Sequence, residues 1–155
     1  SAYEQERMFN RGERIVVGME GVGIGRAALD LAVGYANSRV IFDRPIGKNQ
    51  AVANPLADCW MRLEAAENIC LKAAELFDNH LPCGPESNTS KYLGAEAGYK
   101  ACDQAMQTHG GFGYAKEYHI ERLWREVRLL RLAPISQEMV QNYIANKVLG
   151  LPKSY

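Results

Sequence analysis

The sequence predicts an all-α domain, an up-and-down four-helix bundle with an additional short helix. In its long segments, apolar residues recur every three or four positions, which is the spacing of one face of a helix and not of a strand. The connections between these segments are short and contain proline or glycine, and short loops make consecutive helices antiparallel neighbours. The chain has 155 residues, of which 47% are hydrophobic, enough for the core of one domain.

The first helix is expected over residues 11–42, after a lead-in formed by residues 1–12, because its apolar residues keep helical spacing. Pro45 and Gly47 would stop this helix and turn the chain. Each glycine inside a helix costs up to about 1 kcal/mol relative to alanine, so the glycines here need a reason. They are Gly18, Gly21, Gly23 and Gly25. We expect them to let a neighbouring helix or a ligand approach the backbone.

Further apolar stripes cover residues 56–77, 92–106, 120–130 and 139–148. The stripe over 56–77 steps by three and four without a break, which is typical of helices that pack in a bundle. The next helix is expected to end at Gly110–Gly111. The candidates for its N-cap are Ser87, Asn88 and Thr89. The cysteine and methionine residues on these stripes are interpreted as core residues.

A second interpretation of the first fifty residues is a dinucleotide-binding unit, with a strand over residues 14–18 followed by a glycine-rich phosphate turn. The sequence departs from that pattern because Arg26 stands where the third glycine belongs. No alternation of strands and helices follows Gln50. The helical bundle is therefore the favoured interpretation.

The charge and cysteine content limit the function classes. Eighteen Lys and Arg residues balance eighteen Asp and Glu residues, so no overall field favours nucleic acid or an anionic membrane, and self-association is favoured. The four cysteines show neither zinc-site nor disulfide spacing, and no apolar run is long enough to span a membrane. The chain starts at Ser1 without a methionine or a leader pattern. We expect a domain excised from a longer protein of the bacterial cytoplasm or the mitochondrial matrix.

Residues 38–50 combine a cation, an aromatic ring, a chain reversal and an amide. Arg39 and Phe42 are three positions apart and would share one face of the first helix, and Gln50 follows the turn. A guanidinium group binds phosphate, a ring offers a stacking surface and an amide binds a polar edge, so the segment is a candidate anchor for a phosphate-and-adenine ligand. The alternative is a solvated helix end with an ordinary turn.

A second motif is rich in glycine and reads Gln107-Thr108-His109-Gly110-Gly111-Phe112-Gly113-Tyr114. Together with Tyr35-Ala36-x-x-Arg39-x-x-Phe42-x-x-Pro45-Ile46-x-x-x-Gln50, it resembles the C-terminal domain of the acyl-CoA dehydrogenase family. Members of this family are flavoenzymes that desaturate acyl-CoA thioesters. The resemblance extends from about residue 13 to residue 155. On the glycines alone, the alternative is a plain helix stop. His109 is predicted to be a loop residue beside the two glycines and not a base.

The resemblance implies that this chain contributes to an FAD site shared between subunits. The implied FAD contacts are Arg39, Phe42, Asn49, Gln50, Gln107, Gly110, Gly111 and Gln137. It also implies an acyl-CoA substrate, a homodimer or homotetramer, and an electron-transfer flavoprotein or similar acceptor, with no metal, nucleic acid or membrane. The N-terminal and middle domains of the family are absent from this chain, so the isolated domain is expected to be inactive.

The same resemblance assigns the catalytic base. Many members carry it just before the last helix, but this chain has Ala133 there, which cannot accept a proton. A branch that includes isovaleryl-CoA dehydrogenase places a Glu before an Arg in the first helix of this domain, and Glu13-Arg14 matches that pair. Glu13 is therefore the candidate base, and Arg14 a candidate contact for the CoA thioester. The alternatives are a first-turn acid that complements the helix dipole, a family member without dehydrogenase activity, and a helical interaction module without a ligand.

Overall fold

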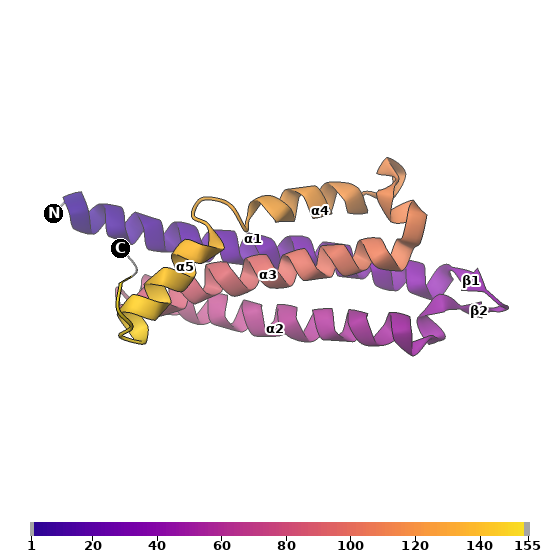
Figure 1. Cartoon of the computed structure of the whole chain (residues 1–155), viewed down its shortest axis with the longest axis horizontal. Coiled ribbons are helices and arrows are strands. Elements are labelled where there is room, and N and C mark those ends of the chain that lie inside the picture. Colours follow the sequence, from indigo (N-terminus) through magenta and orange to yellow (C-terminus); the bar gives the residue numbers. More distant parts are fainter. Residues whose placement is uncertain (1, 154–155) are drawn as a thin grey trace.

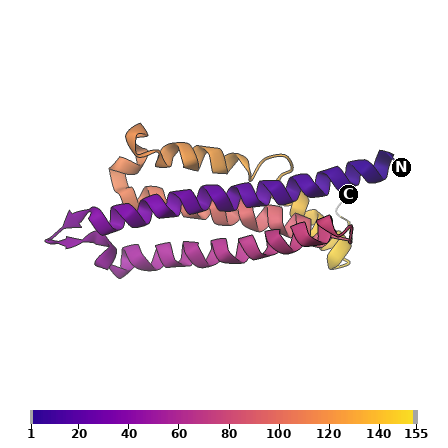
Figure 2. The same cartoon turned by 180° about the vertical axis from the view of Figure 1, so that it is seen from behind.

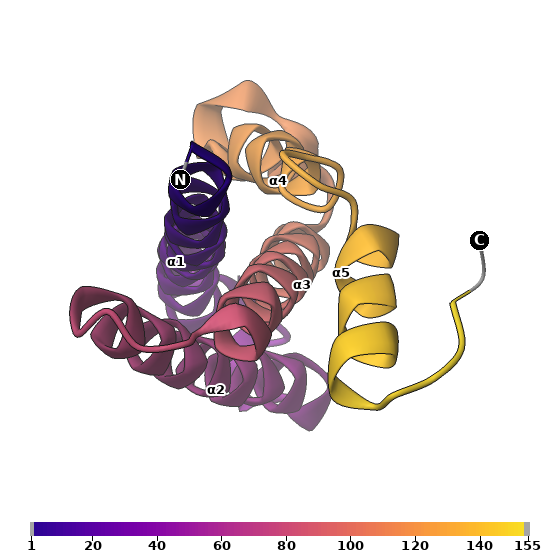
Figure 3. The same cartoon turned by 90° about the vertical axis from the view of Figure 1, so that its left-hand side faces the viewer.

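The computed structural model describes residues 2–153, with side chains from residue 10 onward. Four helices lie side by side along one axis (Figure 1): α1 (Ala2–Ser38), α2 (Gln50–Asp78), α3 (Gly84–His109) and α4 (Ile120–Leu129). A short helix, α5 (Gln137–Tyr143), lies across one end and continues into a π-helical turn at Ile144–Val148 (Figure 3). The 3-10 turns are η1 (Ile46–Lys48), η2 (Gly110–Tyr114) and η3 (Lys116–Tyr118). The predicted all-α bundle with an additional short helix is confirmed.

The first helix ends earlier than the sequence predicted. α1 stops at Ser38, and the chain then forms an antiparallel hairpin of β1 (Val40–Ile41) and β2 (Arg44–Pro45). The β-branched residues of β1 favour extended backbone, and the residue before a proline is disfavoured in the helical region. The prediction that Arg39 and Phe42 share a helix face is therefore wrong.

Two helix starts also differ from the prediction. α1 begins at Ala2, so residues 2–12, predicted as the lead-in to the first helix, are already part of it. α3 begins at Gly84, with Pro85 in its first turn, where the fixed φ of proline suits a helix start. The three predicted cap residues lie inside the helix and donate to carbonyls one turn back: Ser87 and Asn88 to Gly84 (3.1 and 2.9 Å), and Thr89 to Pro85 (2.7 Å).

α1 and α3 approach each other through glycines. A Cβ atom placed on Gly94 would lie 2.1 Å from the carbonyl oxygen of Gly18, and one on Gly98 would lie 2.2 Å from that of Gly21. Real Cβ atoms do not tolerate such distances, so only glycine allows this backbone contact. The expectation that the glycines of the first helix admit a neighbouring helix is confirmed for Gly18, Gly21 and Gly25, but not for Gly23, where a Cβ would meet nothing within 4 Å.

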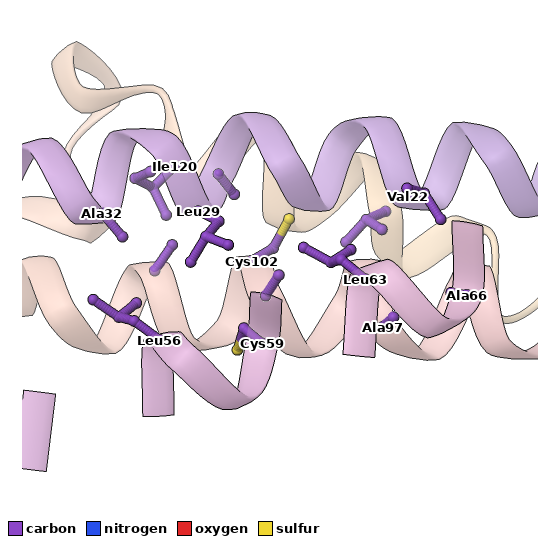
Figure 4. Packing of buried hydrophobic residues seen from close by; sticks show 14 of the residues in the cluster. Val22, Leu29, Ala32, Leu56, Cys59, Leu63, Ala66, Ala97, Cys102 and Ile120 are labelled. Atoms are coloured by element: carbon purple, nitrogen blue, oxygen red, sulfur yellow. The ribbon is translucent and has the colours of Figure 1, made fainter. Parts of the chain in front are cut away.

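The hydrophobic core lies between α1, α2, α3 and α4 (Figure 4). Leu29 of α1, Leu63 of α2 and Ile120 of α4 belong to one buried cluster. All four cysteines are buried and free, and burial raises the pKa of Cys70 to about 11 and that of Cys102 to about 12. They are unreactive core residues, as predicted.

The described residues contain no helix with the length and apolarity of a membrane span. Over the same residues, no group of His, Cys, Asp and Glu side chains could hold a metal ion. The bundle has two distinct ends, seen from both sides in Figures 1 and 2. The hairpin, the start of α2 and the end of α3 form one end, while α5 and the start of α3 lie at the other.

Candidate functional site

The hairpin end brings the two sequence motifs together at Arg39. The Arg39 N–H donates to the Tyr35 carbonyl (2.8 Å), and the Ile46 N–H donates to the Arg39 carbonyl (2.9 Å), so its backbone is held on both sides. The exposed guanidinium group lies over the ring of Phe112, with 5.7 Å between Cζ and the ring centroid. The ring beside the cation therefore comes from the glycine-rich segment. Phe42 instead forms the hairpin turn, 94% exposed with a φ of 53°.

An aromatic cluster supports this cation. The Phe112 and Tyr118 rings stack with centroids 5.1 Å apart, and Tyr118 packs edge-on against Tyr35 and His109. His109 is the last residue of α3 and is 5% exposed, so the prediction that it is a loop residue is wrong. Its Nδ1 lies 2.8 Å from the Ala105 carbonyl, which can only accept, so Nδ1 carries the proton. Through these ring contacts, the segment after α3 packs against the end of α1.

Exposed amides and open glycines surround the cluster. Gln107, in the last turn of α3, and Gln50, the first residue of α2, are both exposed. α3 ends at His109, as predicted, and Gly110 then takes a φ of 60°. A Cβ atom on Gly110 or Gly111 would meet nothing within 4 Å, so the backbone here is open to close approach, and the Gly110 N–H itself donates to the Gln107 carbonyl. The predicted contacts Arg39, Gln50, Gln107, Gly110 and Gly111 thus lie at one end of the bundle.

Asn49 belongs to the same end, but its side chain is used within the hairpin. Its Oδ1 accepts from the Arg44 guanidinium group (2.5 Å), and its Nδ2 donates to the Ile46 carbonyl (3.1 Å). Asn49 therefore holds the hairpin on the start of α2.

Glu13 and Arg14 lie near the opposite end. From Glu13 to the end of α1 the helix rises about 38 Å at 1.5 Å per residue, so the structure does not bring these residues near Arg39. Both side chains are half-buried. Burial lowers the pKa of Arg14, while the nearby Tyr143 and Glu13 oppose that shift.

Arg14 lines a cavity of about 300 Å³ between α1, the start of α3 and α5. The other lining residues include Asn88, Ile135, Tyr143, Asn146 and Lys147. Asn88 is 1% exposed, and its Oδ1, like that of Asn146, has no hydrogen-bond partner in the part of the chain that the structure describes. Cations and unused amide oxygens together suit an anionic ligand that also carries hydrogen-bond donors.

Gln137, the first residue of α5, is buried in a polar network. Its Oε1 accepts from the Lys91 ammonium group (2.9 Å), and its Nε2 donates to Glu96 Oε1 (2.9 Å) and to the Tyr92 carbonyl (3.1 Å). The Arg131 guanidinium group donates to the same Glu96 oxygen (2.9 Å). Both Nε2 hydrogens are used, so one lone pair of Oε1 is all that remains for another ligand.

The fold and the two ends define a class, a helical-bundle domain with an exposed polar end and a cavity lined by cations, and comparison with known proteins identifies the family. The chain belongs to the acyl-CoA dehydrogenase family: residues 5–149 match its model for the acyl-CoA dehydrogenase C-terminal domain. The acyl-CoA dehydrogenase FadE12 of Mycobacterium tuberculosis is 45% identical over 145 residues, which is 92% of this chain and 37% of that protein.

Two solved structures share the fold. One is a glutaryl-coenzyme A dehydrogenase in complex with glutaryl-CoA, 32% identical with a TM-score of 0.87, which covers 93% of this chain and 37% of that one. The other is an FAD complex of PigA, 27% identical with a TM-score of 0.80, which covers 84% of this chain and 34% of that one. The chain thus spans little more than a third of the proteins it matches. It is the C-terminal domain of a member of the acyl-CoA dehydrogenase family, as the sequence predicted. The proteins of this family are oxidoreductases.

Proposed function

We propose that this domain works in a longer, FAD-dependent acyl-CoA dehydrogenase and performs a separate task at each end. The hairpin end anchors the adenine dinucleotide part of FAD, and the Glu13 end supplies the proton acceptor. The observation that carries the proposal is the contact of Arg39 with Phe112, because it joins two motifs that are about seventy residues apart in one exposed site.

The hairpin end fits FAD in its chemistry. Arg39 offers an exposed cation for the pyrophosphate, and Gly110 and Gly111 leave space for close backbone approach. Gln50 and Gln107 offer exposed amides to the polar edges of the ligand. Phe42 and Asn49 complete the set at this end, Phe42 as an exposed ring and Asn49 as a support of the hairpin. Gln137 lies at the Arg14 end, so its remaining lone pair would serve the FAD molecule at that end. FAD supplies the hydride acceptor of the reaction.

The separation of the two ends supports an oligomer. A distance of about 38 Å exceeds the span of one extended FAD molecule. The hairpin end and the Glu13 end of one domain therefore serve two different FAD molecules, and the one at the hairpin end is held mainly by a neighbouring subunit. We propose a symmetric dimer or tetramer, with an electron-transfer flavoprotein or similar protein as the final acceptor.

At the other end, Glu13 takes the proton from the carbon next to the thioester carbonyl. The electron pair left on that carbon would form the new double bond, and a bound FAD would take up the hydride from the adjacent carbon. Arg14 holds the anionic CoA carrier so that this carbon lies within reach of the carboxylate.

The test is Glu13→Gln in the full-length enzyme. This variant keeps the shape of the side chain but cannot accept a proton, so it should retain FAD and bind acyl-CoA. Flavin bleaching by acyl-CoA should slow by roughly two to four decades. Glu75→Gln, which changes an exposed glutamate of α2, is the matched control and should bleach at the parental rate.

Ala133 favours a second candidate function, a family member that binds FAD but does not dehydrogenate. It occupies the place where many members carry the base. A parent enzyme that holds FAD but shows no bleaching with a panel of acyl-CoA thioesters would support this second function. Bleaching that depends on Glu13 would exclude it.

A further inference from the structure

Lys91 is a buried cation that none of the predicted sites uses. It is 0% exposed and is the largest of the fully buried side chains. In the described part of the chain, Gln137 Oε1 is the one hydrogen-bond partner of its ammonium group. Burying a cation without a carboxylate in contact is costly, so packing alone does not explain a lysine at this position.

The partner of Lys91 has a fixed orientation. Gln137 must turn Oε1 toward the donors of Lys91 and Nε2 toward Glu96 and the Tyr92 carbonyl, because the reverse orientation would oppose donors to donors. Glu96 and the Tyr92 carbonyl hold Nε2, and the Lys91 ammonium group is the one contact of Oε1, so loss of the ammonium group would leave this oxygen without a partner. Lys91 therefore helps to hold the first side chain of α5 in place.

The same network holds both ends of the loop between α4 and α5. Glu96 Oε1 accepts from Arg131 at the start of the loop and from Gln137 at its end. The Gln137 N–H also donates to the Arg131 carbonyl (3.3 Å), which closes the loop. Residues 131–137 are thus held on α3 through one carboxylate and one buried lysine.

This loop and α5 form one wall of the cavity at Arg14. Ile135 of the loop and Tyr143 of α5 line that wall, and Arg14 of α1 and Asn88 of α3 also line the cavity. Lys91 is not among the lining residues. It lies on α3, three residues after Asn88, and acts on the cavity through Gln137.

We propose that Lys91 is a positioning residue that, through Gln137, holds residues 131–137 and the start of α5 where they shape the Arg14 cavity for an anionic thioester carrier. The identity of that ligand, an acyl-CoA, rests on the proposed function. The link from Lys91 to the loop is independent of the proposed function.

The charges around Lys91 couple it to the cavity. Burial lowers the pKa of Lys91 to about 8, Glu96 and Glu138 oppose that shift, and Arg14 adds to it. An anion bound at Arg14 offsets the repulsion between the two cations and so raises the pKa of Lys91. Acyl-CoA binding near pH 8 should therefore take up protons, and its affinity should fall as the pH rises above 8.

The experiment compares Lys91→Met with the parent in the full-length enzyme. We expect the KM for acyl-CoA to rise about tenfold at pH 7.5 with little change in kcat, a size typical of coupling between contacting residues. The increase of KM between pH 7.5 and 9 in the parent should disappear in the variant. Gln137→Leu should raise KM equally, and the double variant no further, because both changes break one path.

A variant with a lower Tm but parental KM and pH dependence would show that Lys91 only fills the core and would overturn the proposal. Hydrogen exchange gives a readout that needs no ligand. In Lys91→Met, exchange should accelerate in residues 131–137 and stay parental in residues 40–49 of the hairpin. Equal exchange in both segments would also overturn it.

If Lys91→Met fails to fold, calorimetry on the parent enzyme tests the proposal instead. Acyl-CoA binding at pH 8, measured in two buffers of different ionisation enthalpy, should show proton uptake, and its absence would overturn the proposal. A parent that binds no acyl-CoA would refute the proposed function instead, and hydrogen exchange in Gln137→Leu would then decide the link to the loop.

Discussion

The two ends of the α1 and α3 pair are built in opposite ways, although the same two helices form both. At the hairpin end, Arg39, Gln50 and Gln107 are exposed, and an aromatic cluster and backbone hydrogen bonds hold the segments that carry them. At the Arg14 end, Lys91 and Gln137 are buried and bonded to each other. An end that meets a ligand held by another subunit needs free groups, whereas an end that shapes a cavity within its own chain needs fixed ones.

The glycine contact between α1 and α3 joins the two ends, and breaking it should have the largest effect. In Gly94→Ala the new Cβ would lie 2.1 Å from the Gly18 carbonyl oxygen, so the helices must separate. We expect the free energy of unfolding to fall by about 3 kcal/mol, measured by urea denaturation of the 155-residue chain.

Gly23→Ala is the matched control, because Gly23 lies in α1, the other helix of this pair, and a Cβ there meets nothing within 4 Å. Its unfolding free energy should stay constant or rise by up to about 1 kcal/mol, since alanine favours the helix. Equal losses in the two variants would mean that helix propensity, not the close contact, sets the cost.

Burial of Lys91 at the Arg14 end should also make the stability of the domain depend on pH. The pKa of Lys91 falls from 10.5 to about 8 on folding, so between these values the unfolded chain binds more protons than the folded one. Stability from this group therefore rises as the pH increases from 8 to 10.5, by about 3 kcal/mol at most. The difference in unfolding free energy between the parent and Lys91→Met should follow that rise, and a difference independent of pH would contradict it.

The smallest expected effect concerns the hairpin end. It tests which aromatic ring supports Arg39. Phe112→Leu removes the cation–π contact and should weaken FAD binding by about 0.5 to 1 kcal/mol, a two- to fivefold change in Kd. Phe42→Leu changes a ring that is not in contact with Arg39 in the structure and should have the smaller effect on Kd. The reverse order would return the stacking role to Phe42.

The sequence predicted the bundle well because helical spacing and proline or glycine stops are local signals. The prediction was wrong where contacts between segments distant in the sequence determine which side chains meet. The pairing of Arg39 with Phe112, and not with Phe42, depends on how the end of α3 meets the end of α1. The burial of Lys91 was not predicted, because no feature of the neighbouring sequence distinguishes a buried lysine from an exposed one. Its partner, Gln137, lies forty-six residues away.

The most direct test of the account measures FAD affinity and flavin bleaching by acyl-CoA in two variants of the full-length enzyme, Arg39→Ala and Glu13→Gln. We predict that Arg39→Ala loses about 1.5 to 3 kcal/mol of FAD binding, or one to two decades in Kd, yet bleaches at the parental rate once saturated with FAD. Glu13→Gln should keep the parental Kd and lose the bleaching. Parental FAD affinity in Arg39→Ala, or a similar loss of FAD in both variants, would contradict the division of tasks between the two ends.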